Sequence, residues 1–130
     1  MGAVYERSVS GTIEEVGRRL EQAVQARKYG VLGCIDLREK MKSKGVNFGP
    51  ACRIYEVCNP IRAKHVLEQD MSISTALPCR IALYESAGTL KLATLRPRSI
   101  LAGFGRPELD DEAGQVEEDL KAIIDEVAAP

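Results

Sequence analysis

The residues best suited to chemistry in this sequence are two cysteines that each stand close to a proline. Cys58 lies in a Cys-Asn-Pro run at 58–60, and Cys79 lies in a Leu-Pro-Cys-Arg run at 77–80. Each thiol stands where an apolar run should meet a loop, and loops carried by rigid strands are common places for functional residues. We therefore predict a ligand site near these motifs, formed by Cys58, Asn59, Cys79 and Arg80.

The position of Cys58 indicates two kinds of chemistry. Asn59 is typical of a helix N-cap and Pro60 of a first helical residue, so a helix should begin beside this thiol. The free amides and the dipole of a helix start would lower the pKa of the Cys58 thiol, and Arg80 would act on Cys79 in the same direction. The same amides could bind a small anion. The arginines that could close over such an anion are Arg53, Arg62 and Arg80.

Three classes of function remain open for these motifs. The first is a module that binds a small anionic or thiol-reactive ligand near Cys58 and Cys79. The second is a thiol-dependent enzyme or sulfur carrier that uses one of them as its nucleophile. The third is a structural or partner-binding module, because free cysteines often only pack, as we expect for Cys34 and Cys52. The sequence holds no paired carboxylates, Ser/His/Asp set or Gly-rich phosphate loop, so no catalytic residues are predicted.

Other partners are predicted to be absent. The four cysteines and His65 lack the spacings of zinc sites. A Cys58/Cys79/His65 site would form only if the loops that carry these residues converge. We therefore predict no metal and no cofactor. A pI of 5.9 and the lack of Trp argue against nucleic acid. No apolar run approaches the ~20 residues of a membrane span. Segment 1–7 has no signal-peptide features, so we expect a cytoplasmic protein with reduced thiols.

Charge is unevenly distributed, although the net charge is only −1. Residues 108–130 carry nine Asp/Glu and one Lys, so the rest of the chain keeps 17 of the 18 Lys/Arg and 10 of the 19 Asp/Glu. We expect the acidic end and the basic body to form solvated faces that attract each other within one fold. The alternative is a basic patch that binds an anionic ligand.

Hydrophobic periodicity predicts a single domain over residues 1–130. Thr12 and Glu15 form a capping box at the start of the first long helix, and Gly30 ends that helix. The strand at 31–37 carries apolar residues on both faces, which is typical of a central strand. The predicted elements are strand 4–10, helix 12–30, strand 31–37, a surface helix or basic loop at 38–44, loop 45–50, strand 51–58, helix 60–67, strand 79–85, strand 89–95, linker 103–107 and helix 109–127.

The layer arrangement follows from these elements. Two of the helices are long and amphipathic, and the last two strands form a hairpin with its turn at 86–88. Two long helices on one face of a largely antiparallel sheet would bury the apolar side of each layer. The predicted fold class is therefore α+β.

Three stretches carry a resemblance to a known family. They are Thr-Ile-Glu-Glu-Val at 12–16, Tyr-Glu-Val-Cys-Asn-Pro at 55–60 and Leu-Pro-Cys-Arg-Ile-Ala-Leu-Tyr-Glu at 77–85. In their order and spacing the chain resembles the uncharacterised family catalogued as domain of unknown function 302, over residues 3–128. The resemblance implies a curved antiparallel sheet backed by helices, similar to the TATA-binding-protein-like superfold, and a homodimer. It implies no activity, because one fold hosts many functions.

Overall fold

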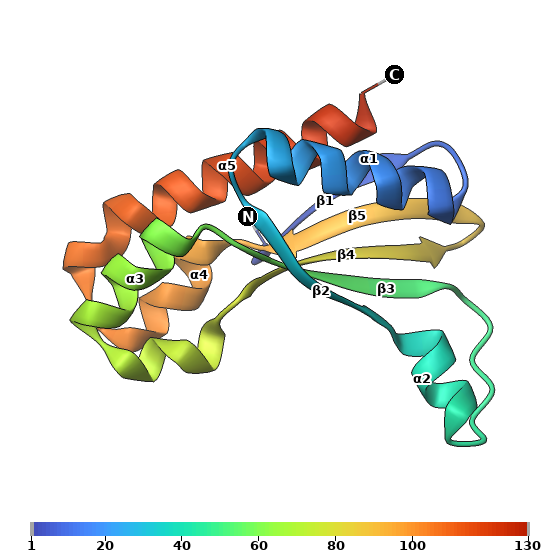
Figure 1. Ribbon diagram of the computed structural model, residues 1–130, viewed down its shortest axis with the longest axis horizontal. Helices are drawn as coiled ribbons and strands as arrows, with labels where there is room; N and C mark the ends of the chain where they lie inside the picture. The colour runs from blue at the N-terminus through green and yellow to red at the C-terminus, as the bar shows by residue number, and fades with distance from the viewer. Residues whose placement is uncertain (1, 130) are drawn as a thin grey trace.

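The computed structural model describes residues 2–129, which form a five-stranded sheet and its helices (Figure 1). The strand order is β1-β5-β4-β3-β2, and every neighbouring pair is antiparallel. The strands are β1 (Val4–Val9), β2 (Gly30–Asp36), β3 (Cys52–Cys58), β4 (Cys79–Ser86) and β5 (Thr89–Leu95). The helices are α1 (Ile13–Ala26), α2 (Leu37–Ser43), α3 (Pro60–Gln69), α4 (Pro97–Leu101) and α5 (Asp110–Ala128), with 3-10 helices η1 (Met71–Ala76), η2 (Ala102–Phe104) and η3 (Pro107–Leu109). The predicted α+β fold with an antiparallel sheet is confirmed.

The main core lies between the sheet and two helices. Figure 1 shows α1 and α5 side by side over one face of the sheet, as the sequence predicted. The fully buried residues of this layer include Val16, Leu20 and Val24 of α1, Val57, Ile81, Leu83 and Leu92 of the sheet, and Leu120, Ile123 and Ile124 of α5. Burying one such side chain stabilises the fold by about 1.5–3 kcal/mol. This contact between layers is therefore the main source of stability.

The start of α1 has the predicted capping box. The Thr12 hydroxyl accepts a hydrogen bond from the Glu15 amide at 3.1 Å and donates one to the Glu15 carboxylate at 3.0 Å. This satisfies a helix amide that would otherwise lack a partner. Within residues 2–129, no helix has the length and apolarity needed to cross a membrane.

The prediction that the strand at 31–37 is central was wrong, because β2 is an edge strand. Val31 packs against the main core, but the register shifts between Val31 and Gly33, which is a β-bulge. Leu32, at the bulge, is 65% exposed. Apolar residues on both faces of this strand therefore did not mean that both faces are buried. The bulge makes the exposed edge less suited to pairing with a strand of another molecule.

The segment after β5 is more helical than predicted. The sequence predicted that the strand ends at residues 96–98 and that a linker follows at 103–107, whereas α4, η2 and η3 occupy most of this stretch. Pro97 takes the first position of α4, where its missing N–H costs nothing. These helices lie with α3 and η1 beyond one end of the sheet (Figure 1).

The helices beyond the sheet enclose a second apolar cluster, here called the end cluster. Its buried members are Val66, Ile73 and Leu109, and Leu77, Leu101 and Phe104 pack against them. The end cluster is separate from the main core. A boundary between two apolar clusters is a natural place for imperfect packing.

The acidic α5 is paired with basic residues of the body. Arg96 lies 3.7 Å from Glu117, and Arg7 lies 3.0 Å from Asp125. These ion pairs support the expectation that the two charged parts attract each other within one fold. The exposed pair at Asp125 contributes little, because surface salt bridges give about 0–1 kcal/mol.

Candidate functional site

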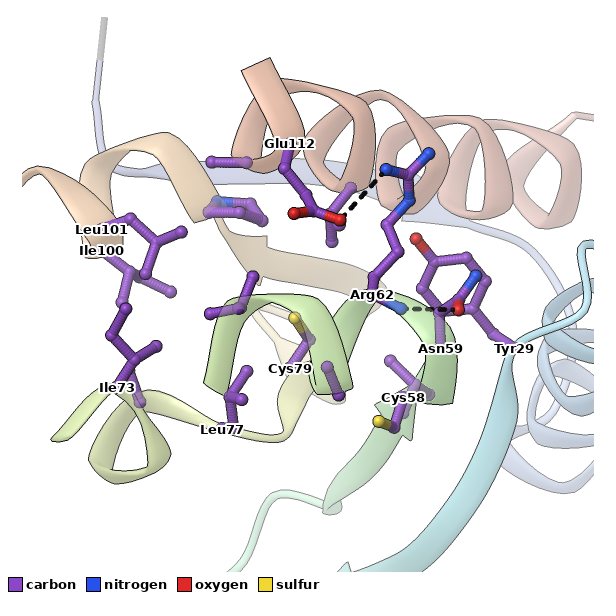
Figure 2. Close-up of a pocket in the computed structure, with 17 residues that line it drawn as sticks. Tyr29, Cys58, Asn59, Arg62, Ile73, Leu77, Cys79, Ile100, Leu101 and Glu112 are labelled. Atoms are coloured by element: carbon purple, nitrogen blue, oxygen red, sulfur yellow. Dashed lines mark hydrogen bonds and ion pairs between the residues drawn. The ribbon is translucent and has the colours of Figure 1, made fainter. Parts of the chain in front are cut away.

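A small cavity lies where the main core meets the end cluster (Figure 2). Its volume is about 60 Å³, and its walls are almost entirely apolar. Val57 and Val116 line it on the side of the main core, and Ile73 and Leu101 line it on the side of the end cluster. The cavity is therefore suited to a compact apolar guest rather than to a polar one.

Cys58 and Cys79 both line this cavity. Cys58 is the last residue of β3 and Cys79 is the first residue of β4, and these strands are neighbours in the sheet. In Figure 2 the two sulfur atoms point in different directions. Both are free thiols. The structure thus brings the two motifs to one cavity without placing the thiols as a facing pair.

Burial raises the pKa of both thiols. The Cys79 thiol has a pKa of about 11, chiefly because burial penalises the thiolate, with the nearby Cys58 acting in the same direction. Burial also raises the pKa of Cys58. The lowered pKa that the sequence predicted for Cys58 was therefore wrong. A thiol that keeps its proton near neutral pH is a poor nucleophile.

Asn59 explains why the helix start does not activate the thiol. Its side-chain oxygen accepts hydrogen bonds from the amides of Ile61 at 3.1 Å and Arg62 at 3.2 Å. The predicted N-cap is therefore confirmed. The cap occupies two amides that would otherwise favour a thiolate or an anion.

Arg80 does not reach the cavity. It lies half-exposed, 3.9 Å from Glu56, its register partner on β3. Successive side chains of a strand point to opposite faces of the sheet. Because Cys79 faces the cavity, Arg80 must turn away from it. Arg53 is also engaged elsewhere, 3.5 Å from Glu14.

The sequence did not indicate two of the side chains that lie at the rim of the cavity. Glu112 at the start of α5 lies 3.4 Å from the Arg62 guanidinium and bonds His65 as well. Tyr29 donates a hydrogen bond to Asp119 at 2.8 Å, and burial raises the pKa of this phenol. The groups meet only in the fold, since Tyr29 and Asp119 are 90 residues apart. Each of these polar groups already has a partner.

The residues around the cavity do not form a metal site. Among residues 2–129, no three His, Cys, Asp or Glu side chains are placed to hold one ion. His65 instead lies on the outer side of α3, with its ring bonded to Glu112 and 58% of the side chain exposed. The Cys58/Cys79/His65 set that the sequence left open is not assembled.

The partly buried thiol of Cys79 predicts a loss of stability at alkaline pH. The Cys79 pKa rises from 9.0 to about 11 on folding, so the unfolded chain releases this proton first as the pH rises. The contribution of Cys79 is therefore complete below about pH 9 and is lost as the pH approaches about 11. Since one pKa unit corresponds to about 1.4 kcal/mol, the loss should reach about 2–3 kcal/mol. Urea unfolding at about pH 8 and about pH 10.5 measures it.

The matched variant for this measurement is Cys79→Ala. It should unfold with a weaker dependence on pH over the same range, because it has no thiol to ionise. Equal losses of stability in the two proteins would contradict the raised pKa of Cys79.

The fold and cavity define a class of protein: an α+β domain with a sheet open on one face and a thiol-lined apolar cavity at one end. The chain belongs to the family described as domain of unknown function DUF302, which matches residues 5–127. It is similar to the crystal structure of an uncharacterized conserved DUF302 protein from Bacillus stearothermophilus, with 31% sequence identity and a TM-score of 0.92. The match covers 96% of this chain and 98% of that chain. None of the curated proteins matches this chain. The predicted family is confirmed.

Proposed function

We propose that this protein binds a small, uncharged, apolar molecule in the cavity lined by Cys58 and Cys79. The observation that supports it is an apolar cavity whose rim groups already have partners. A volume of about 60 Å³ is roughly the share of liquid volume of two waters, and it is less than half of the about 150 Å³ of a cavity that holds benzene. The ligand would therefore have about two to three non-hydrogen atoms.

The apolar walls give the cavity a preference for such a guest. Water placed there would find few hydrogen-bond partners, so a ligand gains affinity without displacing well-bound water. The best small ligands gain about 1.5 kcal/mol per non-hydrogen atom. A three-atom ligand would therefore bind no more tightly than about 0.5 millimolar.

An anionic ligand fits the site less well than the sequence indicated. The start of α3 is capped by Asn59, and Arg80 lies on the opposite face of the sheet. Arg62 is the remaining predicted cation at the rim, and it is paired with Glu112. Burying an anion beside these groups would cost desolvation without a free cation to offset it.

A thiol-dependent enzyme or sulfur carrier is also less well supported. The raised pKa of Cys79 keeps its thiol protonated near neutral pH, whereas nucleophilic catalysis needs an activated thiolate. A module without any ligand remains the competing description. It predicts that nothing binds in the cavity.

Nuclear magnetic resonance of the labelled protein tests the proposal. Xenon and ethane should shift the methyl resonances of Val57, Ile73 and Val116, which line the cavity. Sulfate and phosphate at the same concentrations should leave those methyl groups unchanged. Shifts with the anions alone would support the anionic site, and no shift with any probe would support the ligand-free module.

We also propose that a second copy of the chain covers the open face of the sheet. Val4 and Leu95 are register partners on the face away from α5, and they are 50% and 52% exposed. In a symmetric dimer this pair of side chains would pack against the same pair of the second copy and leave water. Light scattering should give the mass of a homodimer, and Leu95→Glu should give that of a monomer. A monomeric wild-type protein would contradict the proposal.

The free thiols bear on the cellular compartment of the protein. All four cysteines are free, and free thiols persist in reducing compartments. This supports the cytoplasmic location that the sequence predicted.

A further inference from the structure

We propose that residues 60–76, the segment formed by α3 and η1, are a lid over the cavity that an ionic latch on Glu112 holds closed. The proposal rests on the proposed function, because the lid controls how an apolar ligand reaches the cavity. The lid residues Ala63, Val66 and Ile73 line the cavity directly. A ligand that enters the cavity from this side must therefore pass this segment or displace it.

Few buried apolar side chains attach the lid to the rest of the fold. Val66 is the buried residue of α3, and Ile73 is the buried residue of η1. Both belong to the end cluster rather than to the main core. Ile61, at the start of the lid, is 80% exposed. The lid can therefore move without disrupting the contact between α1, α5 and the sheet, and elements with few buried apolar contacts open first.

Glu112 forms the latch across the mouth of the cavity. Its carboxylate accepts from the Arg62 guanidinium at 3.4 Å and bonds the His65 ring. Arg62 and His65 are three residues apart, so they stand on the same face of α3. Figure 2 shows the Arg62–Glu112 contact between α3 and α5. The Glu112 side chain is 14% exposed, so water screens the contact less than it screens an ordinary surface pair.

A second contact holds the other end of α3. Asp70, between α3 and η1, accepts from Arg106 at 3.1 Å. Asp70 also caps η1 through the Ser72 amide at 2.9 Å. The lid is thus held at one end of α3 by Glu112 of α5 and at the other end by Arg106, which precedes η3.

The connections of the lid permit a hinged movement. The chain enters the lid from the end of β3 at Cys58 and returns to the start of β4 at Cys79. These two strands are paired with each other. The lid is therefore a long connection between the ends of two adjacent strands. It can rotate about these ends while the pairing of the two strands stays intact.

Cys79 supplies a built-in reporter for lid opening. Iodoacetamide is small and uncharged, and peptide-resolved mass spectrometry can follow its reaction at Cys79 in the intact protein. Glu112→Gln and Arg106→Gln should each raise the labelling rate of Cys79 several-fold. Lys64→Gln is the matched control, since it removes the 2.6 Å ion pair between Lys64 and Glu68 within α3 itself. It should leave the rate unchanged.

The dependence of the labelling rate on urea separates lid opening from unfolding of the whole chain. Lid opening exposes little surface, so its rate should respond weakly to urea, whereas global unfolding responds steeply. Wild-type rates in both latch variants, or acceleration with a steep response to urea, would overturn the lid. Failure of the proposed function is a different result, namely no xenon or ethane shifts in the wild-type protein.

Discussion

Gly17→Ala destabilises the protein by about 2 kcal/mol, although alanine is the better helix former. A Cβ atom at position 17 would lie 2.4 Å from the Tyr55 hydroxyl oxygen. Tyr55 is 3% exposed and belongs to the main core, so its ring cannot move aside cheaply. Overpacking of this kind costs about 1–3 kcal/mol or more, against a gain of up to about 1 kcal/mol from helix propensity. Urea unfolding measures the difference.

Gly114→Ala is the matched control on the other long helix. Its Cβ would lie 2.3 Å from the Arg98 guanidinium, which is an even closer approach. However, Arg98 is 54% exposed and ends in a flexible chain that can swing away from α5. The gain in helix propensity should then dominate, and stability should stay unchanged or rise by up to about 1 kcal/mol.

The double variant Gly17→Ala/Tyr55→Phe identifies the cause. Removing the hydroxyl oxygen leaves the Tyr55 ring carbon 3.6 Å from the new Cβ, which is ordinary van der Waals contact. The cost of Gly17→Ala should therefore largely disappear in the Tyr55→Phe background, which is a coupling that a double-mutant cycle detects. An undiminished cost would show that another contact is responsible.

The fold could be predicted from the sequence because its signals are local. The capping box at Thr12 and the apolar stripes of α1 and α5 depend on residues within a few positions of one another. The role of β2 could not be predicted in this way. An edge strand is defined by what lies beside it in the sheet, and the apolar pattern around Leu32 carries no such information.

The cavity could be predicted only in part. The motifs placed Cys58 and Cys79 correctly at strand ends, but only the fold shows that both line one cavity. Strand alternation could have shown that Arg80 faces away from Cys79. Glu112 gave no local signal, because its partner Arg62 is 50 residues away in the chain. Ion pairs between residues far apart in the sequence can be identified only once the relative positions of the helices are known.

We expect Cys79→Leu to abolish binding of xenon and ethane, with affinity falling at least about 10-fold, while the fold persists. The leucine side chain is larger than that of cysteine by about two methyl groups, and the cavity of about 60 Å³ has room for little more. Because the added atoms enter an apolar void, stability should be unchanged or rise by about 1 kcal/mol. Titration of the methyl resonances and urea unfolding measure the two effects.

Two further substitutions determine what such a loss of binding means. Cys79→Ala enlarges the cavity and should keep ethane binding, since the proposal needs the space and not the thiol. Loss of ethane binding in Cys79→Ala would show that the cavity collapses when the thiol is removed, which would contradict a preformed cavity. Cys52→Leu places the same side chain on β3 away from the cavity walls and should bind like the wild-type protein. If Cys79→Leu still binds ethane with wild-type affinity, the ligand does not occupy this cavity, because the leucine and the probe cannot share the same space.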